Sequence, residues 1–361
     1  KPKEHANGLL IATQEGFQLG VRQVFAKRFV TWLYAQGEVS MAAVYQKKLQ
    51  EAVERQLLSD VPVGVLLSGG IDSALVASMA KEAGRKLTGF TVGFEAGAED
   101  CEIGDAAETA AVLGLEHRMV RVDPEGLWRN MKRIVSSLEE PISSPSALPL
   151  WDLVKLARSE VTVVLTGQGS DELWGGYRRY QLDLIRARIP SAVLSKMSVF
   201  ERMADSKGIP LWMSRALSSM ALSDKKERFL SSYALFSKGW REELLGEDDP
   251  FEARERIEYW LSWLGEDHLH PTEQMMRIDT KMQLADDFLI YGDKISMAVA
   301  LEMRVPMLDL DLSAWVDSLP LEQKVQLRRS KILHKKMAEG YLPSSIVHRK
   351  KKGFQVPIQD W

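Results

Sequence analysis

Two short glycine-containing segments hold the residues with which this chain could do chemistry. The first, Ser68–Ser73, reads Ser-Gly-Gly-Ile-Asp-Ser, follows the apolar run Val61–Val65 and precedes a helical pattern. Gly69 and Gly70 have no Cβ to block a close approach, and the unpaired N–H groups and dipole of a helix start attract an anion. This order of strand, turn and helix predicts a nucleotide site.

A carboxylate in the same segment indicates a metal ion. The segment lacks the Lys-Ser/Thr ending of a Walker A loop and carries Asp72, which would repel phosphate unless a divalent cation lay between them. The second segment, Thr166–Glu172, also lies between a strand end and an expected helix. Open α/β sheets bind ligands at the carboxyl ends of parallel strands, so both segments should face one crevice. We therefore expect Asp72 and Asp171 to bind a shared Mg²⁺.

The elements that must position these segments alternate between strand and helix. Apolar and β-branched runs predict strands at Leu87–Phe94, His117–Val122 and Val161–Leu165. Helical spacing of apolar residues predicts the neighbouring helices, at about 44–57, 105–113, 125–138 and 148–158. The first part of the chain is thus predicted to be α/β, a parallel sheet flanked by helices.

The rest of the chain has a different pattern. After Tyr177 long helical patterns continue to about Leu301, and the last 40 residues are basic. We expect an α/β core at 41–180 and a mainly helical subdomain at 181–361 that packs against it and returns a basic tail. Residues 1–40 resemble a leading arm, with a hairpin around the turn signal Gln14–Gly16.

Composition excludes several classes of protein. The 361 residues carry 47 basic and 50 acidic side chains, a net charge of −3, so no overall field favours nucleic acid or an anionic membrane. Cys101 is the only cysteine, which excludes an internal disulfide and a cysteine-rich metal site. The sequence shows neither an apolar run of membrane-span length nor a signal-peptide pattern. We expect a cytoplasmic protein with no nucleic-acid or membrane partner, and leave a homodimer open.

Several segments, in order and spacing, resemble a known family from about Val44 to Trp361. They are Ser68–Ser73, Phe90–Phe94, Glu140-Pro141 through Leu148-Pro149, Gly167–Tyr177, Met297–Asp309, Lys331, and Lys352–Phe354 with Pro357. The family is the ATP-pyrophosphatase (PP-loop) synthetase domain of class B, glutamine-dependent asparagine synthetases, with β-lactam synthetases and lasso-peptide cyclases as relatives. The resemblance implies an adenine nucleotide alpha hydrolase-like fold over 41–361, with 41–180 as the ATP-binding core.

The resemblance also implies a reaction and a set of roles. ATP activates a carboxylate by adenylation with release of pyrophosphate, and an amine then displaces AMP to give an amide. Lys331 matches the family lysine that stabilises charge on the phosphates and the departing group. Without the resemblance, Lys331 would be assigned to a solvated helix face. The implied ligand contacts are Ser68, Gly69, Gly70, Asp72 and Ser73 around pyrophosphate, Leu66, Val92 and Gly167 around adenosine, and Asp72 and Asp171 on Mg²⁺.

This sequence departs from the family at Gln168, where well-studied asparagine synthetases have a glutamate thought to assist the attacking ammonia. A glutamine cannot act as a general base. β-Lactam synthetases have tyrosine there and pair it with the glutamate that matches Glu302, so both Gln168 and Glu302 are candidate catalytic residues. The alternative for Glu302 is a buried ion pair with Arg304. The basic run Lys350–Lys352 is expected to form a surface or a phosphate-screening edge.

The chain ends also differ from those of the family. It starts at Lys1 without an N-terminal cysteine or a glutaminase domain, so we expect ammonia from a separate glutaminase module and interpret 1–40 as its remnant or linker. It stops just after Gly353-Phe354, where relatives usually continue, which suggests a fragment or a processed chain.

These observations favour an ATP-dependent amide-forming ligase that uses aspartate or a related carboxylate, with ATP and Mg²⁺. One alternative keeps adenylation but acts on a natural-product or polysaccharide carboxylate, as an amidotransferase or a cyclase. A second is a non-catalytic nucleotide-binding partner. Against that reading, Asp72, Ser73, Asp171 and Lys331 are all present. The sequence does not reveal the acyl donor.

Overall fold

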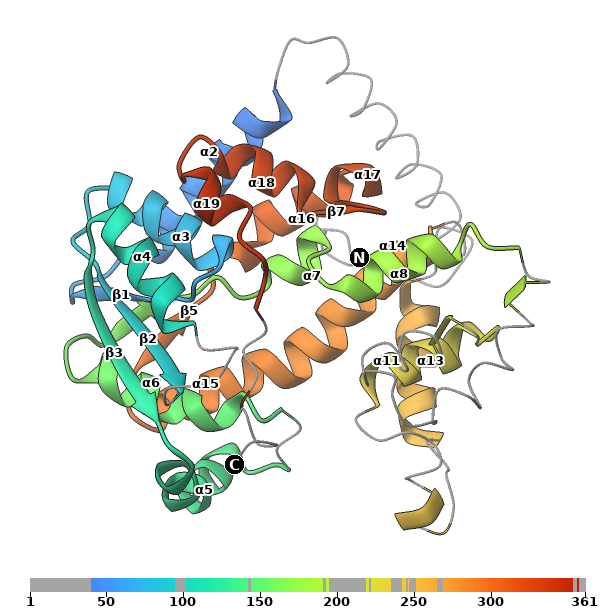
Figure 1. Ribbon diagram of the computed structural model, residues 1–361, viewed down its shortest axis with the longest axis horizontal. Coiled ribbons are helices and arrows are strands. Elements are labelled where there is room, and N and C mark those ends of the chain that lie inside the picture. The colour runs from blue at the N-terminus through green and yellow to red at the C-terminus, as the bar shows by residue number, and fades with distance from the viewer. Residues whose placement is uncertain are drawn as a thin grey trace, which may run out of the picture. The chain divides into compact units, whose positions relative to one another are not determined.

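A computed structural model describes most of the chain after residue 39 (Figure 1). The described residues are 40–94, 102–141, 144–190, 193–194, 219–220, 222–234, 242–244, 246, 251–264, 269–352 and 356. Nearly all of the expected arm 1–40, its hairpin, Cys101 and the Gly353-Phe354 motif therefore lie outside the described residues. No helix in the described ranges is both long enough and apolar enough to span a membrane.

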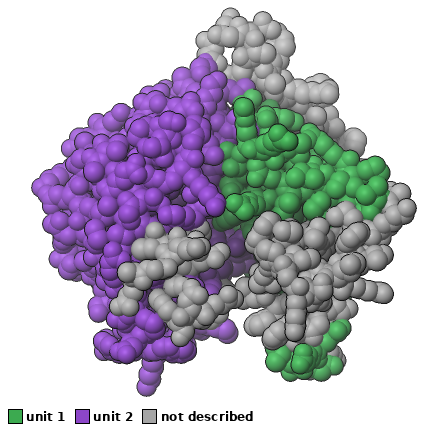
Figure 2. Space-filling view, in the orientation of Figure 1, with its two compact units in different colours: residues 1–32, 175–279, 318–330 green, residues 33–174, 280–317, 331–361 purple. Residues whose placement is uncertain are grey.

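The described chain divides into two compact units, which are coloured separately in Figure 2. Among the described residues, the larger unit takes those within 33–174, 280–317 and 331–361, and the smaller those within 175–279 and 318–330. Segments late in the sequence, within the part expected to be mainly helical, thus belong with the α/β unit. Both glycine-containing segments and Lys331 lie in the larger unit.

A five-stranded parallel sheet organises the larger unit. Its strands are β1 (Val63–Leu66), β2 (Thr88–Phe94), β3 (Glu116–Val122), β4 (Val163–Leu165) and β5 (Glu302–Arg304), in the spatial order β3-β2-β1-β4-β5. The predicted parallel α/β sheet is confirmed, and strands stand where the β-branched runs placed them. Strand β5 was not predicted, because its sequence Glu-Met-Arg has no apolar run. It forms because its backbone pairs with the edge of β4.

Helices cover both faces of the sheet (Figure 1). On one face lie α5 (Pro124–Leu138), α6 (Ala147–Arg158) and α15 (Ile290–Met297). On the other lie α2 (Met41–Gln56), α3 (Ile71–Glu82), α4 (Ile103–Leu113) and α18 (Ile332–Ala338). The buried side of α6 packs on β2 and β3 with Phe90, Val92 and Trp151 in one apolar cluster. Removing these side chains from water is the main force that holds the layers together.

Further helical elements complete this unit. They are α7 (Ser170–Trp174), the π-helix η1 (Thr280–Leu289), the 3₁₀ turn η2 (Pro306–Leu308), α16 (Leu310–Ser318) and α19 (Ser344–Val347). Helix α7 packs against η1. Helix α7 contains Asp171 in its first turn, and α18 begins directly after Lys331.

The smaller unit is mostly helical. It contains α8 (Arg178–Arg186), α11 (Lys225–Tyr233), α13 (Phe251–Leu264), α14 (Pro271–Asp279), α17 (Leu321–Lys324) and the ribbon β6 (Val325–Gln326) with β7 (Arg329–Ser330). Asp279 is fully buried in it and accepts hydrogen bonds from Arg179 (2.6 and 3.0 Å) and from the hydroxyls of Tyr180 and Tyr233. The guanidinium of Arg179 also lies 4.3 Å from the ring centre of Tyr177. This group fastens α8, α11 and α14 together.

Candidate functional site

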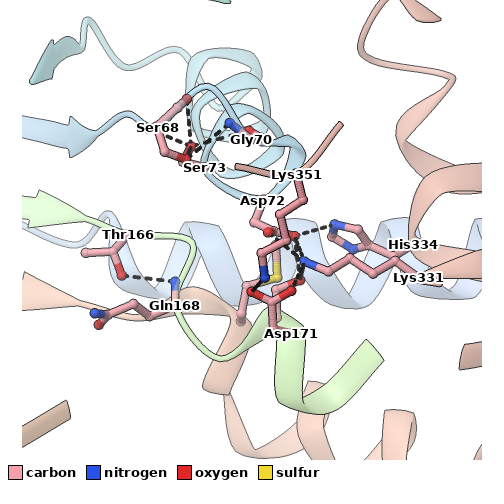
Figure 3. Close-up of polar contacts among 12 residues, drawn as sticks. Ser68, Gly70, Asp72, Ser73, Thr166, Gln168, Asp171, Lys331, His334 and Lys351 are labelled. Carbon is pink, nitrogen blue, oxygen red and sulfur yellow. Dashed lines mark hydrogen bonds and ion pairs between the residues drawn. The ribbon is translucent and has the colours of Figure 1, made fainter. Parts of the chain in front are cut away.

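The first glycine segment turns tightly from β1 into α3. The Ser68 and Ser73 hydroxyls lie 2.9 Å apart, and Ser68 Oγ accepts a hydrogen bond from Gly70 N–H at 3.2 Å (Figure 3). A Cβ on Gly69 would lie 2.3 Å from Asp105 Cβ, so only glycine fits there. Gly70 is the N-cap of α3, and no side chain caps this helix start. No side chain competes for its first-turn N–H groups, and their contact with an anion stays a prediction.

The second segment lies directly against the first. A Cβ on Gly167 would lie 2.6 Å from Ser73 N and 2.9 Å from Asp72 Cβ, so the two backbones pass with no room for a side chain between them. Gly169 has a φ of +85°, a left-handed value that suits glycine, and starts the turn into α7. Asp171 therefore enters the first turn of α7 close to Asp72.

Lys331 bridges the two carboxylates. Its Nζ lies 2.6 Å from Asp72 Oδ2, 2.7 Å from Asp72 Oδ1 and 2.8 Å from Asp171 Oδ1 (Figure 3). Ser170 Oγ donates to Asp72 Oδ1 at 2.7 Å. Lys331 is 3% exposed, so it does not lie on a solvated helix face. The structure thus brings together Asp72, Asp171 and Lys331 from the two loops and the start of α18.

The electrostatics of this cluster favour its charged state. Burial alone would raise the pKa of Asp72, but the Lys331 ammonium and His334 hold that pKa well below its usual range. Burial likewise opposes ionisation of Asp171, whose pKa is nevertheless lowered by Lys331 and Lys351. Burial would lower the pKa of Lys331, and the two carboxylates raise it. Two partly buried carboxylates therefore share one buried ammonium, and each charge favours the ionised form of the other partner.

The backbone at Lys331 is unusual. It has a φ of 55° and a ψ of 44°, the left-handed region, where a side chain with a Cβ is strained. Strain of this kind costs on the order of 1–3 kcal/mol and clusters at functional sites. Here the left-handed residue is the N-cap of α18 and carries the ammonium that joins both carboxylates.

The basic tail reaches the same loops. Lys351 Nζ lies 2.7 Å from Asp171 Oδ2, and Lys352 Nζ lies 2.7 Å from Asp105 Oδ2. Arg349 donates to Gly69 O at 2.7 Å and to Asp105 O at 2.9 Å. The tail is thus anchored at the first glycine segment, and Lys351 provides a second cation beside Asp171.

Two side chains that sequence reasoning missed complete the cluster. His334 is fully buried on α18, with Nε2 3.1 Å from Asp72 Oδ1 and Nδ1 2.7 Å from the hydroxyl of Tyr45 on α2. Tyr45 is also fully buried. The basic sequence around His334 suggests a surface helix, and 289 residues separate it from Tyr45, so no local pattern links them.

The candidate residues for adenosine lie at or near the carboxyl end of the sheet. Leu66 is the last residue of β1, Val92 lies on β2 two residues beyond the partner of Leu66, and Gly167 follows β4. Val92 is buried, and Leu66 packs against the same apolar cluster. Their proposed contact with adenosine stays a prediction.

Gln168 and Glu302 are placed apart from the ion cluster. Figure 3 shows the Gln168 side chain directed away from Asp171 and Lys331. Its Oε1 is buried, next to Gly292, and has no hydrogen-bond partner in the described part of the chain. Glu302 starts β5 opposite Val163, and its side chain, 55% exposed, accepts a hydrogen bond from Arg304 at 2.7 Å. Among the described residues no polar contact joins Glu302 to the cluster. The expected Glu302–Arg304 pair exists but is exposed on the Glu302 side.

Comparison with known sequences decides the family. The profile of the family described as asparagine synthase matches residues 45–361. The chain belongs to the asparagine synthase family. Asparagine synthetase [glutamine-hydrolyzing] 1 of Bacillus subtilis is 34% identical over 317 residues, which are 87% of this chain and 49% of that protein. This chain spans about half the length of the curated relatives it matches.

Family resemblance extends to proteins with other names. Amidase chyE of Penicillium rubens is 27% identical over 376 residues, which are 91% of this chain and 54% of that protein. Among solved structures, NMN synthetase from Francisella tularensis is 16% identical with a TM-score of 0.30, covering 65% of this chain and 97% of that one.

Proposed function

We propose that this member of the asparagine synthase family is an ATP-dependent amide-forming ligase that activates aspartate or a related carboxylate and transfers it to ammonia. The observation that supports this most is the cluster of Asp72 and Asp171 on one buried lysine, Lys331, beside an uncapped helix start. The relatives' names include glutamine hydrolysis, so a glutaminase module is the proposed source of ammonia.

The residues present fit a magnesium-bound nucleotide. The uncapped start of α3 and the close-packed loops leave backbone N–H groups for phosphate oxygens. Asp72 and Asp171 are the oxygen ligands that Mg²⁺ prefers. When bound, Mg²⁺ would supply positive charge that screens the carboxylates from the phosphates. We assign its binding to these two residues.

The reaction needs two displacements. A substrate carboxylate oxygen attacks the α-phosphorus of ATP, the bond from that phosphorus to the bridging oxygen breaks, and pyrophosphate leaves. Ammonia then attacks the acyl carbon, the acyl–oxygen bond breaks with its electrons on AMP, and the nitrogen loses a proton. Lys331 would stabilise the negative charge on pyrophosphate as it departs, because its ammonium is fixed, charged and shielded from water.

Gln168 would orient the nucleophile. Its buried Oε1 has no protein donor among the described residues, and a buried acceptor without a partner costs about 1–3 kcal/mol. An N–H of ammonia could satisfy it. Since glutamine cannot take a proton, water or a phosphate oxygen would accept the proton lost by nitrogen.

In the decisive experiment, the protein is incubated with ATP, Mg²⁺ and one candidate carboxylate at a time, and pyrophosphate release is recorded. Ammonium is then added, and amide formation is measured. One carboxylate should stimulate pyrophosphate release, and omission of Mg²⁺ should abolish it. The Lys336→Ala protein serves as the matched control, since Lys336 is exposed on the same helix as Lys331. No carboxylate-dependent pyrophosphate release from any acid tested would contradict the proposal and favour a nucleotide-binding partner without activity.

A second candidate keeps adenylation and changes the substrate. Gln168 in the position that separates chemistries within the family, and the likeness to a protein named as an amidase, both support a larger natural-product or polysaccharide carboxylate, with transfer to another amine or cyclisation. Pyrophosphate release with such acids but not with aspartate would select this candidate.

A further inference from the structure

A buried tyrosine and a buried histidine form a polar chain that ends on Asp72. The Tyr45 hydroxyl lies 2.7 Å from His334 Nδ1, and His334 Nε2 lies 3.1 Å from Asp72 Oδ1. Both side chains have no solvent exposure. The ring centre of Tyr45 lies 4.6 Å from that of Trp174 and 5.9 Å from that of Trp315. The proposed reaction gives neither Tyr45 nor His334 a role.

The polar contacts define where the histidine proton lies. Burial and the nearby Asp72 raise the pKa of Tyr45, so its hydroxyl keeps its proton and can donate. Met307 Sδ, 3.9 Å away, is a much weaker acceptor than His334 Nδ1. With Nδ1 accepting, the neutral ring carries its proton on Nε2, toward the Asp72 carboxylate. The opposite tautomer would aim a lone pair at a carboxylate oxygen.

The two carboxylate oxygens of Asp72 have different neighbours. Oδ1 is approached by Ser170 Oγ, Lys331 Nζ and His334 Nε2; Figure 3 shows Lys331 and His334 beside Asp72. Oδ2 is approached by Lys331 alone among the described residues. Two hydrogen bonds and the nearby Nε2 therefore surround Oδ1, whereas Oδ2 retains lone pairs for a ligand.

We propose that Tyr45 and His334 are positioning residues for Asp72: the Tyr45 hydroxyl orients the His334 ring, and its Nε2–H holds Oδ1 so that Oδ2 faces the divalent cation. The inference rests on the proposed function only in that Asp72 binds such a cation. Carboxylate ligands of metals are commonly held by outer hydrogen bonds of this kind. Nε2 lies 3.1 Å from Oδ1 without forming a hydrogen bond in this structure, and catalytic hydrogen bonds are often formed fully only when the ligand is bound.

The geometry of α18 explains how one helix places both Lys331 and His334 beside Asp72. Lys331 is its N-cap and His334 follows three residues later, so the two side chains lie on the same face. Lys331 supplies charge to both carboxylates, and His334 supplies a directional contact to one oxygen. A packing role alone would require neither the hydroxyl of Tyr45 nor the nitrogen at Nε2.

The test measures cation binding directly. Mn²⁺ is titrated into the protein in the presence of a non-hydrolysable ATP analogue and followed by electron paramagnetic resonance. His334→Leu should weaken Mn²⁺ binding about 10- to 100-fold, the usual loss for an outer partner of a metal ligand. His334→Gln, whose amide N–H can replace Nε2–H, should recover most of the loss. Tyr45→Phe should weaken binding about 3- to 10-fold, the size of one hydrogen bond.

The matched control is Tyr180→Phe, which removes another fully buried tyrosine hydroxyl whose carboxylate partner is Asp279. It should lower the melting temperature without changing Mn²⁺ binding. Unchanged Mn²⁺ binding in His334→Leu, or equal losses in His334→Gln and His334→Leu, would overturn the inference. The His334 and Tyr45 variants could differ in Mn²⁺ binding as expected while no carboxylate triggers pyrophosphate release. In that case the proposed function fails and the positioning role stands.

Discussion

Two carboxylate clusters of this protein, one around Asp279 and one around Asp72 and Asp171, use similar side chains in different ways. Asp279 meets one guanidinium and two tyrosine hydroxyls, so a single anion has a full set of donors. Asp72 and Asp171 instead share Lys331, Lys351 contacts Asp171, and the two carboxylates repel each other. The first group is saturated by its own chain, whereas the second retains acceptor capacity and a strained backbone.

The difference separates a structural bond from a site prepared for a ligand. A buried ion pair with complete hydrogen bonding fixes helices in place and leaves little for a ligand to contact. A cluster that lies beside an uncapped helix start and contains a left-handed lysine becomes better satisfied when a cation and an anion bind together. Substitutions in the two groups should therefore affect different measurements.

The largest effect should come from the Mg²⁺ ligands. Asp72→Asn and Asp171→Asn each remove an anionic ligand and should abolish Mg²⁺-dependent pyrophosphate release, a loss above about 10³-fold. Circular dichroism should show the folded spectrum for both. Near-normal turnover in either variant would refute the shared-metal assignment and make the cluster a second structural group.

Lys331→Ala should come next. Removing one electrostatic stabiliser should lower kcat by roughly 10²-fold, with a smaller change in the KM for ATP. Steady-state pyrophosphate release at varied ATP gives both constants, with Lys336→Ala as the reference. An effect confined to the KM would make Lys331 a binding residue.

The comparison is sharpest for Asp279→Asn. This change leaves Arg179, whose side chain is 21% exposed, without its anion, so the free energy of unfolding should fall by about 3 kcal/mol. Turnover per folded molecule should stay near that of the wild type. Urea unfolding and kcat at a temperature where both proteins are folded test this. Loss of kcat without loss of stability would break the distinction between the two groups.

Gln168 tests nucleophile capture. Gln168→Leu should impair ammonia-dependent amide formation more than pyrophosphate release, because it removes the unpartnered acceptor. Gln168→Glu should raise ammonia-dependent turnover or leave it unchanged. The two half-reactions are assayed separately. Normal capture of ammonia by the leucine variant would place the nucleophile elsewhere and favour a cyclase or another amine.

The smallest effect concerns pH. The pKa of Asp72 is lower in the folded protein than its ordinary value, so its ionised form adds stability above the unfolded pKa, about 3.9. That contribution is lost as pH falls through the folded pKa. The difference in unfolding free energy between wild type and Asp72→Asn should therefore be constant above about pH 5 and shrink below pH 4. A difference that grows on acidification would contradict the assignment.

Local pattern was enough for part of this structure. Strands β2 to β4 and the helices around them follow from apolar runs and helical spacing, because their own residues supply the buried surface. Strand β5 could not be found this way, since it depends on pairing with β4 rather than on its polar sequence. The two aspartates were found because each follows a glycine turn at a strand end.

Other members of the site depend on contacts that no local pattern records. Tyr45 and His334 meet only after α2 and α18 pack on the same face of the sheet. The basic run near the end of the chain was predicted to form a surface or a phosphate-screening edge, and no local pattern showed that Lys351, 48% exposed, would contact Asp171. Glu302 was named through family likeness, and its exposed side chain pairs with Arg304 instead of joining the cluster.

The missing side chain at Gly167 has a consequence for anyone who engineers this protein. Because its backbone lies against Ser73 and Asp72, the distance between the two carboxylates is set by main chain touching main chain. Neither loop can be lengthened, exchanged or redesigned without shifting the other. A graft of this site onto another scaffold must therefore transfer both loops together, with the contact at Gly167 intact.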